Sequence, residues 1–102
     1  MAPDEVVLHD AGAARAITTL WMLEELGVPY RLARRDAREP AGRGPTLQVG
    51  RVVVSETAAI CTYLADRYGY GSLAPCIEHP DRGPWLRWMA FAAAALEPVA
   101  ST

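Results

Sequence analysis

The sequence predicts an α/β fold with a small mixed sheet. Three observations lead to this prediction. Short apolar runs alternate with stretches of helical length, the order strand, helix, strand opens the chain, and two short strands flank Gly50. A strand–helix–strand unit is typical of a parallel pair, whereas a tight turn between two strands gives an antiparallel hairpin. The expected order is therefore β-α-β, an irregular link, β-β-α and one further helix.

The first half of the chain is expected to hold the parallel pair. Residues 6–9 (VVLH) are rich in β-branched side chains, which is typical of a buried strand. Residues 13–26 are rich in Ala, Leu and Met and end at Gly27, a common residue just past a helix. The apolar positions of this helix cover a wide stripe, so we expect it to pack on two sides. Residues 30–33 form the second strand.

The second half begins with an irregular link at residues 34–44, which contains Pro and Gly. Residues 46–49 and 51–55 form the hairpin, and residues 57–68 form the second helix. Residues 84–96 form the last helix, which starts with a proline, a residue favoured in the first turn. The apolar side chains of this helix cover most of its circumference. One small sheet cannot cover them all, so we expect an exposed apolar patch.

Composition limits the classes of partner. Ten arginines are nearly balanced by twelve acidic residues, and the formal net charge is −2. This balance argues against nucleic acid as a partner. Cys61, expected to be buried in a helix, lies far along the chain from Cys76, expected to be exposed, and the two form no metal-ligand or disulfide pattern. We therefore expect no metal and a reducing compartment.

No segment is predicted to enter a membrane. The longest apolar run, residues 88–96, has nine residues, whereas about 20 are needed to span a bilayer. The first residues, MAPDE, contain neither the basic region nor the apolar region of a secretory signal. We therefore expect a cytoplasmic protein.

Four segments resemble the N-terminal part of cytosolic glutathione S-transferases. LHDAGAARAITTLWMLEELGVPY is similar to their first strand, first helix and second strand, and EPAGRGPTL is similar to their proline loop. VSETAAICTYLADRYGYGSLAP resembles their fourth strand, third helix and linker, and WLRWMAFAAAALEP resembles the first helix of their all-helical second domain. Together the segments cover nearly the whole chain. The resemblance implies a thioredoxin-like β-α-β-β-β-α fold with one extra C-terminal helix, and glutathione as the co-substrate.

The resemblance also divides the chain. It implies a glutathione-binding domain at residues 1–72, a linker at residues 73–83, and the first helix of a truncated helical domain at residues 84–102. In the family, the second domain supplies most of the pocket for the electrophile. A full transferase would therefore need a second domain or a partner.

The resemblance assigns glutathione binding to Arg43, Gly44, Pro45, Glu56 and Thr57. The start of the helix at Thr57 favours an anion such as the glutathione α-carboxylate, with the Thr57 hydroxyl as a donor and Glu56 as an acceptor for the ligand's ammonium group. Pro45 stands where the family has a cis proline, which turns the backbone of Gly44 towards a peptide-like ligand. Arg43 occupies the position of a loop lysine and suits an anionic ligand.

Simpler roles remain open for the same residues. Ser55 or Thr57 can act only as an N-cap, because short hydroxyl side chains are common at that position. Arg43 can be one of several arginines on a solvated surface. The residues alone do not choose between these roles and ligand binding.

The catalytic position departs from the family. Members stabilise the glutathione thiolate with Ser, Tyr or Cys just after the first strand, and the matching place here is Ala14, within the run of residues 11–14 (AGAA). None of these side chains can donate a hydrogen bond, so the catalytic residue is unknown. Arg15 is expected at the surface, and a lone histidine such as His9 is expected to be structural.

Three functions remain open from the sequence. The first is a glutathione transferase that conjugates the thiol to a small electrophile once a second domain or partner completes it. The second is a non-catalytic glutathione-binding or dimerisation module, which the missing hydroxyl favours. The third is a truncated, inactive fragment, which the short length favours. The exposed apolar helix also predicts a homo-oligomer.

Overall fold

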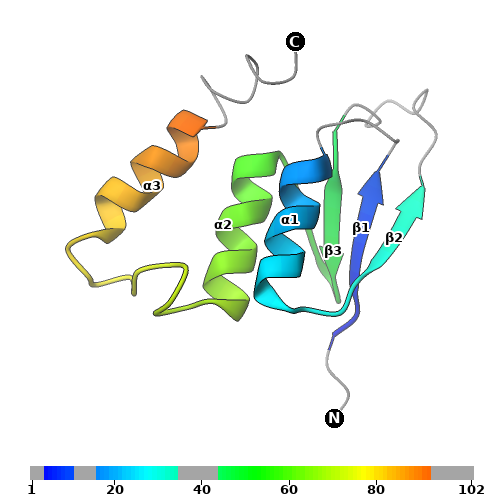
Figure 1. Ribbon diagram of the computed structural model, residues 1–102, viewed down its shortest axis with the longest axis horizontal. Coiled ribbons are helices and arrows are strands. Elements are labelled where there is room, and N and C mark those ends of the chain that lie inside the picture. The colour runs from blue at the N-terminus through cyan, green and yellow to red at the C-terminus, as the bar shows by residue number, and fades with distance from the viewer. Residues whose placement is uncertain (1–3, 11–15, 35–43, 93–102) are drawn as a thin grey trace.

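The computed structural model describes residues 4–10, 16–34 and 44–92 and confirms the α/β fold. A four-stranded sheet has the strand order β2-β1-β3-β4. Helices α1 and α2 lie side by side on one face of this sheet, and α3 lies beyond α2 (Figure 1). In chain order the elements are β1 (Val6–Asp10), α1 (Ala16–Leu26), β2 (Arg31–Arg34), β3 (Thr46–Val49), β4 (Val52–Ser55), α2 (Thr57–Tyr68) and α3 (Arg82–Phe91).

The parallel first pair and the antiparallel hairpin agree with the sequence prediction. Strand β1 pairs with β2 in parallel and with β3 in antiparallel. Strands β3 and β4 form the expected hairpin, and Gly50 in its turn has φ +59. A Cβ added at Gly50 would lie 3.0 Å from the Asp4 carboxyl group. Glycine is therefore required there for both its backbone conformation and its size.

The core lies between the sheet and the two helices. Leu8 on β1 and Leu47 on β3 are paired across the sheet and have no exposed surface. Because side chains alternate along a strand, the second residue on either side of each also faces the helices. The buried cluster consists of Val6, Leu8, Leu23, Leu47, Val49, Ile60 and Leu64.

The expectation that α1 packs on two sides is wrong for this chain. One face is buried, through Ala16, Thr19 and Leu23. Ile17 and Trp21 on the other face are 63% and 67% exposed. Helix α1 therefore carries the wide apolar stripe seen in the sequence, but the sheet and α2 bury only part of it.

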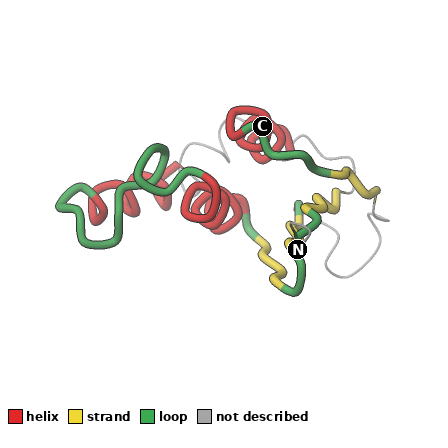
Figure 2. Tube along the Cα trace, turned by 90° about the horizontal axis from the view of Figure 1, so that it is seen from below, coloured by secondary structure: helices red, strands yellow, loops and turns green. Residues whose placement is uncertain are grey.

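The last helix begins two residues earlier than predicted, at Arg82, and packs against α2 rather than against the sheet. None of its residues is buried. Seen from below, α3 and the loop before it lie at one end of the molecule (Figure 2). The predicted end of this helix, at residue 96, lies outside the described residues. The expected exposed apolar patch is confirmed at Leu86, Trp88 and Phe91.

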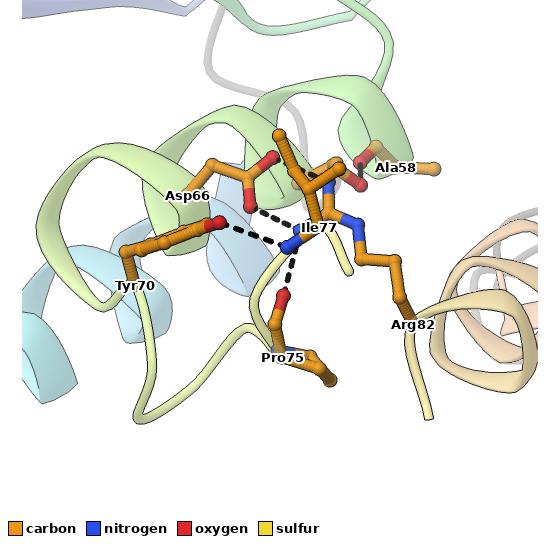
Figure 3. Close-up of polar contacts among 7 residues, drawn as sticks. Ala58, Asp66, Tyr70, Pro75, Ile77 and Arg82 are labelled. Carbon is orange, nitrogen blue, oxygen red and sulfur yellow. Dashed lines mark hydrogen bonds and ion pairs between the residues drawn. The ribbon is translucent and has the colours of Figure 1, made fainter. Parts of the chain in front are cut away.

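A polar cluster holds the loop between α2 and α3 (Figure 3). Arg82 donates to both carboxylate oxygens of Asp66 on α2 and, at 2.9 Å, to the carbonyl oxygen of Pro75. The backbone N–H of Ile77 donates to the Tyr70 hydroxyl at 2.8 Å. The loop is therefore fixed to the C-terminal half of α2, far from the N-terminus of that helix.

Candidate functional site

The ends of four elements meet at one edge of the sheet. Strands β1 and β4 both run antiparallel to β3, so β1 and β4 end at the edge where β3 begins. Helix α2 starts directly after β4, at the same edge. Figure 1 shows the C-terminal end of β1 near the first turns of α1 and α2. Residues far apart in sequence are thereby brought together.

The strand register gives the order of residues along this edge. The last paired row contains His9, Thr46 and Ser55. Continued by one step beyond these pairs, the register puts Asp10 opposite Pro45 and Pro45 opposite Glu56, and we refer to these three residues as the next row. Neighbouring strands lie about 4.8 Å apart, so this row spans about 10 Å. Two of the five predicted glutathione-binding residues therefore share one row.

Glu56 has an unusual backbone. Its φ is 78°, the only positive φ of a non-glycine residue in the described part of the chain. It is the N-cap residue of α2, but its side chain makes no capping hydrogen bond. Such conformations cost about 1–3 kcal/mol and collect at ligand sites. The Glu56 side chain is exposed at this edge of the sheet and does not cap α2.

The simple N-cap role for Ser55 or Thr57 is wrong. The cap position belongs to Glu56, and Thr57 is the first helical residue. The Ser55 hydroxyl instead lies 3.3 Å from the Thr46 hydroxyl on the neighbouring strand. Thr57 is half-buried, beside Glu56, at the N-terminal end of the helix dipole.

Gly44 and Pro45 lie at the start of β3, as predicted. Pro45 is buried and Gly44 is half-buried. The expected cis bond before Pro45 is absent, because no described residue follows a cis peptide bond. Gly44 has open space around the position of a Cβ, so a larger residue would also fit there. The two residues thus lie at the predicted place with a different backbone geometry.

Several predicted residues cannot be placed. Arg43 and the alanine-containing run at 11–15 lie outside the described residues. Among the others, His9 lies with its Nε2 3.1 Å from the Gln48 side-chain oxygen, which agrees with a structural role. Cys61 is buried and Cys76 is exposed, as expected, and the two do not form a disulfide.

Asp10 was not predicted as a site residue. It is only 7% exposed, and its Oδ1 atom has no hydrogen-bond partner. Within the described residues only one other buried side-chain atom, the Thr19 hydroxyl oxygen, is in the same state. In the sequence, Asp10 is an ordinary polar residue at a strand end. Only packing reveals that one of its carboxylate oxygens is buried without a hydrogen-bond partner.

A cavity of about 510 Å³ lies at the opposite edge of the sheet, where β1 begins. Two ion pairs lie along it, Arg31 with Glu5 and Arg67 with Asp4, each at 3.0 Å. Hydrogen bonds from Arg67 to Tyr63 and Asp4 raise its pKa further above the ordinary value. The charges of this cavity are therefore paired with each other. It is lined by Asp4, Glu5, Val6, Gly27, Val28, Pro29, Tyr30, Arg31, Arg67 and Tyr68.

Neither a metal centre nor a membrane-spanning helix is found in the described ranges. Over residues 4–10, 16–34 and 44–92, no three side chains of His, Cys, Asp or Glu are grouped to hold a metal ion. The helices within those ranges are too short or too polar to cross a bilayer.

The sequence matches a known family. A family model described as glutathione S-transferase, N-terminal domain, matches residues 14–67, more than half of the chain. Glutathione S-transferase 3 of Schizosaccharomyces pombe is 34% identical over 105 residues, which cover 91% of this chain and 43% of that protein.

Solved structures show the same similarity. The theta class glutathione S-transferase of Xanthomonas axonopodis pv. citri, solved with glutathione bound, is 28% identical, with a TM-score of 0.73 over 96% of this chain and 52% of that one. A glutathione transferase from Phanerochaete chrysosporium, solved with oxidized glutathione, has a TM-score of 0.78 over 95% of this chain and 51% of that one. At 22% identity this second likeness concerns the fold alone. The chain thus spans about half the length of these relatives, and it belongs to the glutathione S-transferase family, whose N-terminal, thioredoxin-like domain it matches.

Proposed function

We propose that this chain binds glutathione at the edge that contains Pro45 and Glu56. We further propose that, with a second domain or a partner, it conjugates the glutathione thiol to small electrophiles. The observation that best supports this proposal is the positive φ of Glu56 at the start of α2. A conformation that costs free energy is retained where a local requirement fixes it. The family relative with glutathione bound supports this choice of ligand.

Each predicted residue has a proposed role in binding. The N-terminus of α2 attracts an anion, so the glutathione α-carboxylate lies beside Thr57, which donates from its hydroxyl. The exposed Glu56 carboxylate accepts from the ligand's ammonium group. The half-buried backbone of Gly44, before Pro45, pairs with the peptide backbone of the ligand. Arg43 offsets the charge of the second ligand carboxylate.

The proposed reaction is nucleophilic attack by sulfur. The thiol loses its proton to solvent, the sulfur forms a bond to carbon of the electrophile, and the leaving group departs with the bonding electrons. In the relatives this chain covers only about half of the protein. A pocket for the electrophile is therefore proposed to come from a second domain or a partner.

A second candidate function is a non-catalytic glutathione-binding module. The observation in its favour is the run at residues 11–14, AGAA, where no side chain can stabilise a thiolate. In this function the site holds glutathione without activating it. Binding is then retained, and conjugation is absent.

Calorimetry with glutathione tests the shared part of both functions. We expect the wild-type chain to bind, and Thr57→Ala to bind about tenfold more weakly, because one hydrogen bond to a charged group is lost. Thr18→Ala is the matched control, since Thr18 is an exposed threonine on α1, and its affinity should equal that of the wild type. If the wild-type chain gives no heat at millimolar glutathione, both functions are wrong.

A conjugation assay separates the two functions. The chain is mixed with glutathione and an activated aryl halide, and the conjugate is followed by absorbance. A rate above the uncatalysed reaction that falls in Thr57→Ala supports the transferase. Binding by calorimetry without any rate increase supports the binding module.

We also propose that the protein is a cytoplasmic homo-oligomer. Leu86, Trp88 and Phe91 on α3 are 42%, 60% and 45% exposed, and apolar side chains gathered on one helix favour contact with a second copy. Cys61 and Cys76 are not joined in a disulfide, which agrees with a reducing compartment.

A further inference from the structure

Asp10 differs from every other carboxylate among the described residues. It ends β1, it is 93% buried, and its Oδ1 atom accepts no hydrogen bond. The other carboxylates of this part of the chain are half-buried or exposed. A buried charge without a partner is costly, so proteins seldom retain one unless a ligand or a catalytic role requires it.

The nearest cation in the sheet does not relieve this cost. Arg34 on β2 is the register partner of Asp10. Its side chain is nevertheless exposed, and it donates nothing to Oδ1. Burial of Asp10 is therefore not explained by an ion pair within the sheet.

The position of Asp10 relates it to the proposed glutathione site. It shares the row with Pro45 and Glu56, about 10 Å from Glu56 across two strand spacings. By alternation from Leu8, its side chain lies on the sheet face covered by α1 and α2. That is also the face where α2 begins. Glutathione is a tripeptide with its cysteine in the middle, so a ligand whose first residue lies at Glu56 has that cysteine beside Pro45, the neighbour of Asp10 in the row.

We propose that the Asp10 carboxylate accepts a hydrogen bond from the thiol of the bound glutathione, and thereby selects the free thiol over an S-substituted one. This inference rests on the proposed glutathione site. In this arrangement the ammonium group of glutathione lies at Glu56 and its peptide backbone lies beside Pro45. The remaining hydrogen-bond donor of the ligand is the S–H group, which then lies near Asp10. An acceptor that carries a negative charge takes such a donor more strongly than a neutral one.

An acceptor at the sulfur bears on which of the two proposed functions this chain has. A negative carboxylate next to sulfur opposes the formation of a thiolate. A transferase needs the reverse, namely a donor aimed at the sulfur. Asp10 therefore favours the binding module, in which glutathione is held as the neutral thiol.

A thermodynamic cycle tests the proposal. Glutathione and S-methylglutathione, which lacks the S–H donor, are each titrated into the wild type and Asp10→Leu. We expect the variant to bind glutathione about tenfold more weakly and S-methylglutathione equally well, because only glutathione loses a charge-assisted hydrogen bond. Asp81→Asn, at an exposed carboxylate near α3, is the control and should leave both affinities unchanged.

Thermal unfolding without ligand gives a second, independent measurement. Removal of an unpartnered buried charge should raise the midpoint of Asp10→Leu by a few °C. A structural acceptor would instead lower it. Asp10→Asn keeps the shape of the side chain and carries a neutral acceptor, so it tests the proposal if Asp10→Leu does not fold. We expect Asp10→Asn to bind glutathione more weakly than the wild type and to unfold at a higher temperature.

Two results would contradict the role of Asp10, and a third would contradict the glutathione site itself. The inference is wrong if the Asp10 variants weaken both ligands by the same factor. It is also wrong if Asp10→Asn and Arg34→Gln lower the midpoint equally, because Asp10 would then be the structural partner of Arg34. If the wild type binds neither ligand, the proposed glutathione site itself is wrong.

Discussion

The guanidinium group of Arg82 and the carboxylate of Asp66 form a two-point ion pair that joins α3 to α2. The two N–H···O distances are 2.6 Å and 2.8 Å. The same guanidinium lies 4.8 Å from the centre of the Trp85 ring. No residue of α3 in the described part of the chain is buried, so we expect this ion pair to help hold the helix against α2 (Figure 3).

Loss of the Asp66 charge should loosen α3. In Asp66→Asn the Arg82 guanidinium group no longer forms a two-point ion pair with a carboxylate. Helix α3 should therefore detach more often from α2. Trypsin should then cleave after Arg82 several-fold faster than in the wild type, since cleavage follows local opening. Mass spectrometry of the fragments measures this rate. Glu78→Gln, at an exposed carboxylate in the loop before α3, is the control, and equal rates in all three proteins would show that the ion pair does not hold the helix.

The contribution of this pair should depend on pH. The hydrogen bond from Arg82 lowers the pKa of Asp66 below its ordinary value of 3.8. A carboxylate with a lowered folded pKa stabilises the fold above the unfolded pKa, and this stabilisation is lost as the pH falls through the folded pKa. The difference in free energy of unfolding between wild type and Asp66→Asn should therefore be constant near neutral pH and shrink below 3.8. Urea unfolding at several pH values measures it, and a difference that grows towards low pH would contradict the prediction.

Thr19 carries an unsatisfied hydroxyl in the core. Its side chain is 0% exposed and its Oγ1 has no partner. Thr19→Val keeps the shape and removes the polar atom, so the free energy of unfolding should rise by about 1 kcal/mol. Thr18→Val makes the same change at an exposed position of the same helix and should have little effect. A loss of stability specific to Thr19→Val would show that the hydroxyl has a stabilising partner.

Self-association should depend on α3. Trp88 is 60% exposed and stands edge-to-face with Phe91, at 5.5 Å between ring centres. Trp88→Gln removes the largest exposed apolar side chain of α3, so light scattering should show a shift towards monomer. Ile17→Gln, at an equally exposed position on α1, should retain the oligomer. A wild-type chain that is monomeric at high concentration would contradict the proposed homo-oligomer.

Most of the fold could be predicted because its signals are local. The β-branched run before Asp10, the tight turn at Gly50 and the boundaries of α2 follow from neighbouring residues alone. The predicted bounds of α2, residues 57–68, agree with the structure. The site was predicted less completely. The positions of Pro45 and Glu56 followed from the family resemblance, whereas the trans bond before Pro45 and the backbone of Glu56 did not.

Local sequence thus predicted the order of the elements along the chain, the parallel first pair, the antiparallel hairpin and the exposed apolar helix α3. Tertiary packing settled what remained: one face of α1 left exposed, and Asp10 buried at the same end of the sheet as Pro45 and Glu56 with one unpartnered oxygen. The reason is physical. Periodicity and turn residues act over a few positions along the chain, whereas burial and the lack of a hydrogen-bond partner depend on strands that meet only after folding.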